Sequence, residues 1–239
     1  MMKKISFGVF MLILFYVTNL QAQFERSAGK IMADKKAGGI IETWNLEKSN
    51  IVAGSFFINQ DWYIGDVRLT DGRALTKVPL KYNLRDNLLH ILDGNNEIRV
   101  INSAKIAEFE WFNFEDKKNN RYVNCNDYQV NHFGLVGVAE LLVEGKANLL
   151  VYRVLEIQKG MYSVIHDAGQ KNDEYIINEN HYISLGEVMY LIKNKKSLEG
   201  IFKEQQAQME KFIKANHFKV KNEEHLSEIV RYYNSLMGN

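Results

Sequence analysis

The chain has 239 residues, of which 46% are hydrophobic, 25% are charged and 12% are aromatic. This composition is typical of a folded globular protein and excludes a disordered, collagenous or low-complexity chain. Because 30 Lys and Arg residues are balanced by 29 Asp and Glu residues, we expect no nucleic-acid partner.

The first segment has the pattern of an export signal. Two lysines precede an apolar run over residues 5–17, and Ala22 closes the short polar stretch that follows. This order of basic, apolar and small residues is typical of a secretory signal peptide. The run of about 13 apolar residues is shorter than the roughly 20 that a membrane-spanning helix needs. We therefore expect residues 1–22 to be cleaved, with no membrane span afterwards.

The mature chain divides into three parts. Residues 23–50 are polar, contain glycines and show little periodicity, which predicts a lead-in segment. From residue 51 onward, short β-type runs alternate with turn residues, as in an antiparallel sheet. We expect a β-rich domain over residues 51–183 and a C-terminal helical region over residues 184–239.

The clearest hairpin lies around Asp71-Gly72, between β-type runs over residues 64–70 and 73–82. Asp-Gly between two such runs is the strongest short-range hairpin signal. Alternation predicts one buried face on the second run, made of Thr76, Val78, Leu80 and Tyr82. Pro79 cannot donate to a ladder, so this strand should be an edge strand or carry a bulge.

Two more turns follow along the chain. Asp93-Gly94-Asn95-Asn96 and Glu144-Gly145-Lys146 each separate two β-type runs. The first lacks the alternating acidic ligands and distal Glu of an EF-hand, so we predict a turn rather than a calcium loop. Residues 148–155 are apolar on both faces, which is typical of a central strand.

At Ser184 the apolar period changes from two to 3.6. Ser184 and Glu187 have capping-box spacing, which predicts a short helix ending near Asn194. Two amphipathic stretches follow, and their apolar residues are Leu198, Ile201, Phe202, Met209, Phe212 and Ile213, then Leu226, Ile229, Val230, Tyr233 and Met237. The expected fold is α+β: an antiparallel β meander, curved or barrel-like, followed by two or three helices.

The order of elements resembles a known group of proteins. Its features here are the export signal, the hairpin strand ending in Val78-Pro79-Leu80-Lys81-Tyr82-Asn83, the Glu144-Gly145-Lys146 hairpin and the final Val230-Arg231-Tyr232-Tyr233-Asn234. In this pattern the chain is similar to a group of uncharacterised exported proteins of Gram-negative, Bacteroides-type bacteria. The resemblance covers most of the mature chain and implies an envelope location. It includes no catalytic motif, so it transfers no active residue.

The sequence contains no serine-hydrolase, phosphate-loop or zinc-protease motif, and it indicates no catalytic, cofactor or metal site. The nearest candidates are the single Cys125, with His132 as a conceivable base, and the adjacent His166 and Asp167. A lone cysteine forms no intrachain disulfide and is most often a small buried hydrophobe. A hydrolase-type enzyme built on Cys125 or His166 remains an alternative.

Four aromatic residues are candidates for ligand binding: Trp62, Tyr63, Trp111 and Phe112. Exported binding proteins hold glycans and apolar ligands on such rings, although core packing is the alternative. We expect a non-catalytic binding or interaction module of the cell envelope, periplasmic or at the cell surface. Its partner would be an envelope protein or a small apolar or glycan ligand. A membrane-associated β protein is the remaining alternative.

Overall fold

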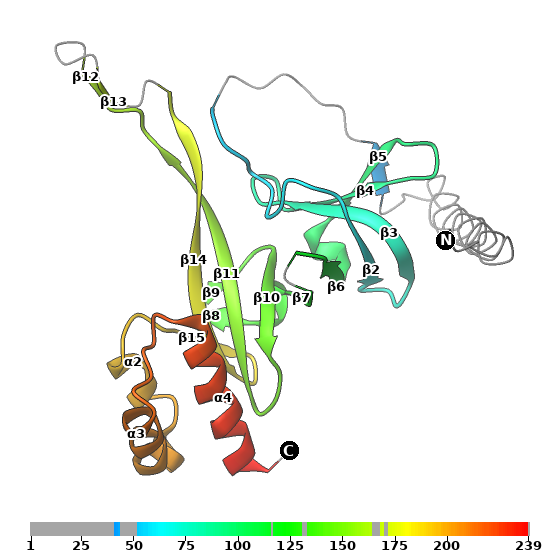
Figure 1. The fold of residues 1–239 in the computed structure, drawn as a ribbon. Helices are drawn as coiled ribbons and strands as arrows, with labels where there is room; N and C mark the ends of the chain where they lie inside the picture. Colours follow the sequence, from blue (N-terminus) through cyan, green and yellow to red (C-terminus); the bar gives the residue numbers. More distant parts are fainter. Residues whose placement is uncertain are drawn as a thin grey trace, which may run out of the picture.

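The computed structural model describes residues 41–43, 52–115, 117–130, 133–163, 168–169 and 172–238. The expected signal peptide and most of the lead-in segment lie outside these residues. Within them, one 13-stranded sheet and a separate two-stranded sheet are followed by helices (Figure 1). The expected α+β fold, a meander followed by a helical unit, is confirmed.

The strands of the first part are β1 (Ile41–Thr43), β2 (Tyr63–Leu69), β3 (Ala74–Asn83), β4 (Leu88–Leu92), β5 (Ile98–Asn102), β6 (Ile106–Asn113) and β7 (Lys118–Asn124). Those of the second part are β8 (Gln129–Val130), β9 (Phe133–Gly134), β10 (Val138–Val143), β11 (Ala147–Gln158), β12 (Tyr162–Ser163), β13 (Ala168–Gly169), β14 (Glu174–Leu185) and β15 (Val188–Leu191). The α-helices are α2 (Lys196–Glu199), α3 (Gln206–Ala215) and α4 (Glu223–Met237), and the 3-10 turns are η2 (Ser103–Lys105), η3 (Cys125–Asp127) and η4 (Lys203–Gln205).

The large sheet has the order β1-β5-β4-β3-β2-β6-β7-β10-β11-β14-β15-β8-β9. Its neighbours are antiparallel except for β15 and β8. β11 lies between β10 and β14, which confirms that residues 148–155 belong to a central strand. No helix of the described residues is long and apolar enough to span a membrane.

The predicted turns are present. Gly72 lies between β2 and β3 with a φ of 86°, a conformation that glycine adopts readily. Between β4 and β5, one carboxylate oxygen of Asp93 accepts the backbone N–H groups of Asn95 and Glu97, each at 2.9 Å. Asp93 therefore organises a turn from within.

The predicted inward face of β3 needs one correction. The pairing of β2 with β3 shifts register between Gly65 and Val67, and Lys77 has a φ of 54°. This bulge turns Thr76 outward and puts Leu75 into the core. The strand therefore carries a bulge, as predicted, but at Thr76 and Lys77 rather than at Pro79, which pairs in register with Ile64 and precedes the first pair of β3 with β4.

The predicted helix at Ser184 is wrong. β14 runs on to Leu185, turns at Gly186 with a φ of 59° and returns as β15. The Ser184 hydroxyl is buried and accepts a hydrogen bond from the Asn148 side chain at 3.2 Å. Continuous pairing with β11 outweighs the local capping signal, so the helical region starts at Lys196.

The concave face of the curved sheet holds an aromatic core. Its rings pack at centroid distances of 5.7 Å for Tyr82 and Phe109, 4.8 Å for Phe109 and Tyr122, and 4.6 Å for Trp111 and Tyr122. The buried members of this core are Val67, Leu69, Leu75, Val78, Leu80, Tyr82, Leu89, Ile91, Ile101, Ile106, Phe109, Trp111, Tyr122 and Val138.

The helices cover the sheet further along. Asn222 caps α4 as predicted, since its side chain accepts the backbone N–H of His225 at 2.8 Å. The buried residues of this helix-covered core are Val143, Ala147, Leu149, Ile183, Ile192, Leu198, Ile201, Phe202, Met209, Ile213, Leu226, Ile229, Val230 and Tyr233. The predicted apolar stripes therefore pack against the sheet.

One buried side chain fastens α4 to the sheet. Asn234 accepts the backbone N–H of Ala147 at 2.8 Å and donates to the Ala147 carbonyl at 2.9 Å. The amide of Asn234 also lies against Gly145, where a Cβ atom would approach its nitrogen to 2.3 Å. The helix therefore requires a glycine in the β10–β11 turn.

The longest hairpin of the sheet is formed by β11 and β14. The two strands pair from Ala147 with Leu185 to Gln158 with Glu174. The half of the hairpin near Ala147 lies beneath the helices, whereas the half near Gln158 projects beyond the other strands of the large sheet (Figure 1). We call this second half the distal ribbon, residues 152–158 and 174–180.

Candidate functional site

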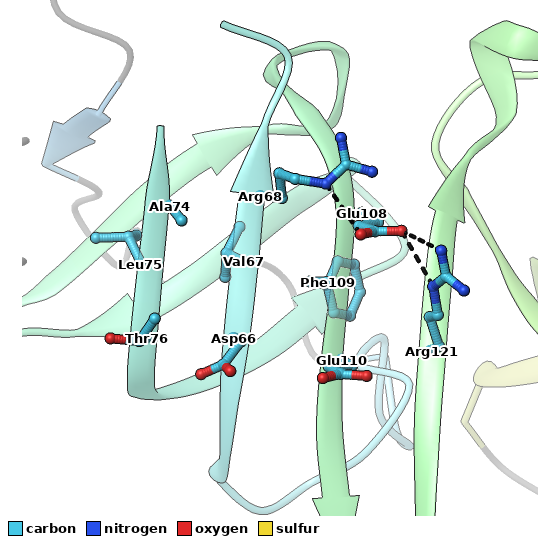
Figure 2. Close-up of a pocket in the computed structure, with 10 residues that line it drawn as sticks. All are labelled: Asp66, Val67, Arg68, Ala74, Leu75, Thr76, Glu108, Phe109, Glu110 and Arg121. Carbon is cyan, nitrogen blue, oxygen red and sulfur yellow. Dashed lines mark hydrogen bonds and ion pairs between the residues drawn. The ribbon is translucent and has the colours of Figure 1, made fainter. Parts of the chain in front are cut away.

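An open pocket of about 340 Å³ lies on the outer face of β3, β2, β6 and β7. Figure 2 shows its lining residues: Asp66, Val67, Arg68, Ala74, Leu75, Thr76, Glu108, Phe109, Glu110 and Arg121. Alternate residues of a strand face opposite sides of the sheet. The charged side chains therefore point outward, while Val67, Leu75 and Phe109 belong to the aromatic core.

Glu108 is the centre of this charged groove. One of its oxygens lies 2.9 Å from Arg68 Nε, and the other lies 2.6 Å from Arg121 Nη2 (Figure 2). These arginines hold the pKa of Glu108 below its ordinary value, Arg68 most strongly, against a smaller desolvation effect. Glu108 is therefore ionised at neutral pH and holds both guanidinium groups in place.

Arg121 connects the groove with the next hairpin. Besides Glu108, its guanidinium reaches Glu144 in the β10–β11 turn, with Nη1 at 2.7 Å from the carboxylate oxygen. Arg68 uses only its Nε in the described ion pair, and its side chain is 56% exposed. The remaining donors of Arg68 are thus available to a bound molecule.

Two further acids stand opposite one another. Asp66 on β2 is paired in register with Glu110 on β6, and like charges in this arrangement repel. Asp66 accepts the backbone N–H of Lys77 at 2.7 Å, from the β3 bulge. Among the described residues, no hydrogen bond or ion pair engages the exposed carboxylate of Glu110. A ligand that donates hydrogen bonds would offset this repulsion.

Exposed apolar side chains continue the groove. Phe112 follows Glu110 by two residues on β6 and therefore lies on the same face. Its ring contacts that of Phe114 edge-on at 5.0 Å. Phe112, Phe114 and Ile64 are 37%, 71% and 44% exposed, so the face combines fixed charges with accessible aromatic surface.

The four aromatic residues singled out in the sequence occupy three different places. Tyr63 stacks on buried Trp111 at 5.9 Å, beside the aromatic core. Trp62 lies under the Lys81 ammonium, with Nζ 4.7 Å from the ring centroid. Phe112 alone extends the charged groove. The structure therefore brings Tyr63 and Trp111 together and leaves Trp62 and Phe112 apart.

Sequence reasoning missed Arg68, Glu108 and Arg121. Their alternation with apolar residues shows that each faces solvent. It does not show that β2 pairs with β6 across the β3, β4 and β5 meander. That pairing is what brings Arg68 to Glu108.

Cys125 is fully buried in a third apolar cluster, with Ala139, Leu150, Tyr182 and Met189. This cluster lies on the opposite face of the sheet from the aromatic core and the helix-covered core. Burial raises the pKa of its thiol to about 12, so the thiol is protonated at neutral pH and is a poor nucleophile. The prediction of a buried hydrophobe is confirmed. His132, His166 and Asp167 lie outside the described residues.

The described residues include no group of three or more His, Cys, Asp or Glu side chains arranged to hold a metal ion. Comparison of the chain with protein-family models, curated proteins and solved structures gave no match.

Proposed function

We propose that this protein is an exported, non-catalytic binding protein of the cell envelope, periplasmic or at the cell surface, and that the charged groove binds a glycan. The observation that carries the proposal is the row of outward charges, Arg68, Glu108, Glu110 and Arg121, beside the exposed ring of Phe112. The signal-peptide pattern over residues 1–22 and the resemblance to exported proteins support the location.

The groove chemistry suits sugar hydroxyl groups. Carboxylates accept hydrogen bonds and guanidinium groups donate them, and one hydroxyl can do both. Arg68 and Glu110 offer these two functions from adjacent strands at fixed register. An aromatic ring such as Phe112 provides the flat apolar surface on which a sugar ring packs.

An apolar ligand fits the groove less well. Covering Asp66, Glu110 and Arg68 with apolar groups would remove their water without replacing its hydrogen bonds, which costs free energy. The mixture of both charge signs also gives no preference for a polyanion. A neutral or weakly charged glycan meets both conditions.

The binding experiment uses the chain from Gln23 onward on an array of bacterial envelope glycans. We expect specific binding that Arg68→Ala and Glu110→Gln each weaken by about tenfold, since a hydrogen bond to a charged group contributes about 1.5 to 3 kcal/mol. The matched control is Arg73→Ala, which removes a partly exposed arginine paired with Asp71 in the β2–β3 turn. Binding to no glycan, or binding unaffected by both groove variants, would contradict the proposal.

Export is tested separately. Cells producing the full chain are fractionated, and the amino terminus of the product is determined by mass spectrometry. We expect an envelope product that begins at Gln23 and a cytoplasmic product when residues 2–22 are deleted. A full-length cytoplasmic protein from the intact gene would contradict export without bearing on the glycan groove.

A further inference from the structure

A second pocket, of about 380 Å³, lies between the turn that joins β3 to β4 and the distal ribbon. It is lined by Leu84, Arg85, Asn87, Tyr152, Arg153, Val154, Leu155, Ile157 and Tyr175. The charged groove shares none of these residues. The second pocket is therefore distinct from the proposed glycan site.

One wall of this pocket is the edge of a strand. β11 pairs with β14 as far as Gln158, but its pairing with β10 ends at Val151. Beyond Val151, the side of β11 that β10 leaves uncovered faces the pocket. Among the described residues, no strand pairs with that side.

The hydrogen bonds of β14 show which groups β11 presents there. Tyr175 donates its backbone N–H to Ala53, and the His181 carbonyl accepts from Ile192. These odd-numbered residues of β14 therefore point away from β11. In an antiparallel ladder the paired residue does the same, and Tyr175 pairs with Ile157. Leu155 and Ile157 thus direct their N–H and carbonyl groups into the pocket.

The side chains around this edge are apolar with two positive charges. Leu155, Ile157 and Leu84 line the pocket together with Arg85 and Arg153, and the lining includes no acid. Arg85 is held over the Phe56 ring, 4.4 Å from its centroid. The carboxylates that pair with the two arginines, Asp86, Glu140 and Glu179, lie outside the lining. The lining therefore offers guanidinium N–H donors, from which an acidic side chain can accept, among apolar side chains.

We propose that the pocket binds an extended segment of a partner protein, which adds a strand to β11 at Leu155 and Ile157. The segment has apolar side chains at alternate positions and one acidic residue near the two arginines. Peptides that add to a sheet edge gain affinity from backbone hydrogen bonds and specificity from alternate side chains.

The geometry favours one extended chain over a second folded copy. The turn at Leu84–Asn87 stands across from the β11 edge and blocks the approach of another whole sheet. From Arg153 to Ile157 the edge is about 13 Å long at roughly 3.3 Å per residue. A segment of four or five residues is enough to cover it.

The test is selection of a random heptapeptide library displayed on phage against the chain from Gln23 onward. The key variant is Ile157→Pro, which removes one N–H that points into the pocket and leaves the ladder with β14 intact. The matched control is Ile177→Pro. Ile177 is the partner of Leu155 in the same ribbon, and its N–H points to the opposite edge.

We expect enriched peptides to alternate apolar residues and to contain an acid. They should bind Ile157→Pro at least about tenfold more weakly and Ile177→Pro as well as the unmodified protein. Thermal unfolding checks that both variants fold, and hydrogen exchange should show slowed exchange at Leu155 and Ile157 when peptide is bound.

The proposal is overturned by failure to enrich any peptide, or by peptides that bind Ile157→Pro undiminished. It is also overturned if size-exclusion chromatography shows a dimer of the chain that Ile157→Pro dissociates, because the edge then serves a second copy. None of these three results would affect glycan binding at the charged groove.

Discussion

One face of the large sheet is covered in two different ways. From β5 to β7 the sheet curves over its own aromatic side chains, and the core around Phe109 is enclosed largely by strands. Around β11 the strands do not enclose this face themselves, and α2, α3 and α4 cover it instead. The aromatic core therefore depends on close approach between strands, whereas the helix-covered core depends on the docking of the C-terminal helices onto the sheet.

A polar seam separates these two cores on that face. Glu140 is 3% exposed and lies between Tyr122 of the aromatic core and Val151 beside the helix-covered core. Its carboxylate accepts from Arg153 Nη1 at 2.8 Å and from the Asn120 amide at 2.6 Å. The two cores therefore meet at a buried ion pair rather than through continuous apolar packing.

The largest expected loss of stability is in the aromatic core, which strands enclose. Gly65→Ala places a Cβ 2.1 Å from the backbone oxygen of Glu110, so β2 and β6 must separate. We expect a loss of about 5 kcal/mol or more in unfolding free energy, measured by urea denaturation with near-ultraviolet circular dichroism. Gly200→Ala is the control, because a Cβ there meets nothing within 4 Å. Equal effects of the two changes would refute the close strand approach.

The second largest loss of stability is expected at the polar seam around Glu140. Glu140→Ala leaves the Arg153 guanidinium buried with only Glu179 as a described acidic partner. We expect a loss of about 3 to 5 kcal/mol, measured in the same denaturation assay. Glu179→Ala, at a carboxylate that is 45% exposed, should cost about 1 kcal/mol or less. If the two variants are equally destabilised, the seam is not a buried junction.

Asn234→Ala tests the helix-covered core. It removes both hydrogen bonds to Ala147 and leaves a buried strand N–H and carbonyl without these partners. We expect a loss of about 2 to 3 kcal/mol. Far-ultraviolet circular dichroism should report helix loss before the aromatic signal changes. Coincident loss of both signals would show that the two cores unfold as one unit and would remove the distinction between them.

The smallest expected effect is a pH dependence of the unfolding free energy. It comes from His90 on β4, whose side chain lies on the opposite face of the sheet from the aromatic core. His90 is buried edge-on against Phe57, with ring centroids 5.1 Å apart, and pairs in register with Lys81. Desolvation, helped by Lys81, lowers its pKa from 6.5 to about 4. The unfolded chain therefore binds the proton first, and stability falls as pH drops from 6.5 toward 4.

We expect this loss to reach about 2 kcal/mol at pH 5 and to be absent above pH 7. His90→Phe should flatten the profile of unfolding free energy against pH, whereas the exposed His217 changed to Asn should leave it unaltered. A profile that keeps its slope in His90→Phe would assign the pH dependence to another group.

Local signals predicted the hairpins well, because Asp71-Gly72 and Asp93 determine turns through their own backbone angles and side chains. The apolar face of α4 was predicted equally well, since Leu226, Ile229 and Val230 repeat at helical spacing. Ser184 misled because a capping signal is local, whereas the pairing of β14 with β11 is not. Thr76 misled for the related reason that a bulge shifts the alternation by one residue.

The charged groove could not be read from the sequence because its parts come from separate hairpins. Asp66 and Glu110 are each visible as outward charges, but only the β2–β6 register places them face to face. A cluster of aromatic residues in the sequence does not separate ligand-binding rings from core rings. Neighbours in sequence such as Trp111 and Phe112 point to opposite sides of one strand, one into the core and one toward solvent.

The bond between Asn234 and Ala147 spans 87 residues of sequence. Contacts of such long range close late in folding, because a large loop must be ordered before they form. While the chain folds, Leu149 and Ile183 would wait uncovered until α4 docks. Docking of α4 is therefore the step that covers these side chains, and its timing should decide how much of the protein aggregates during refolding.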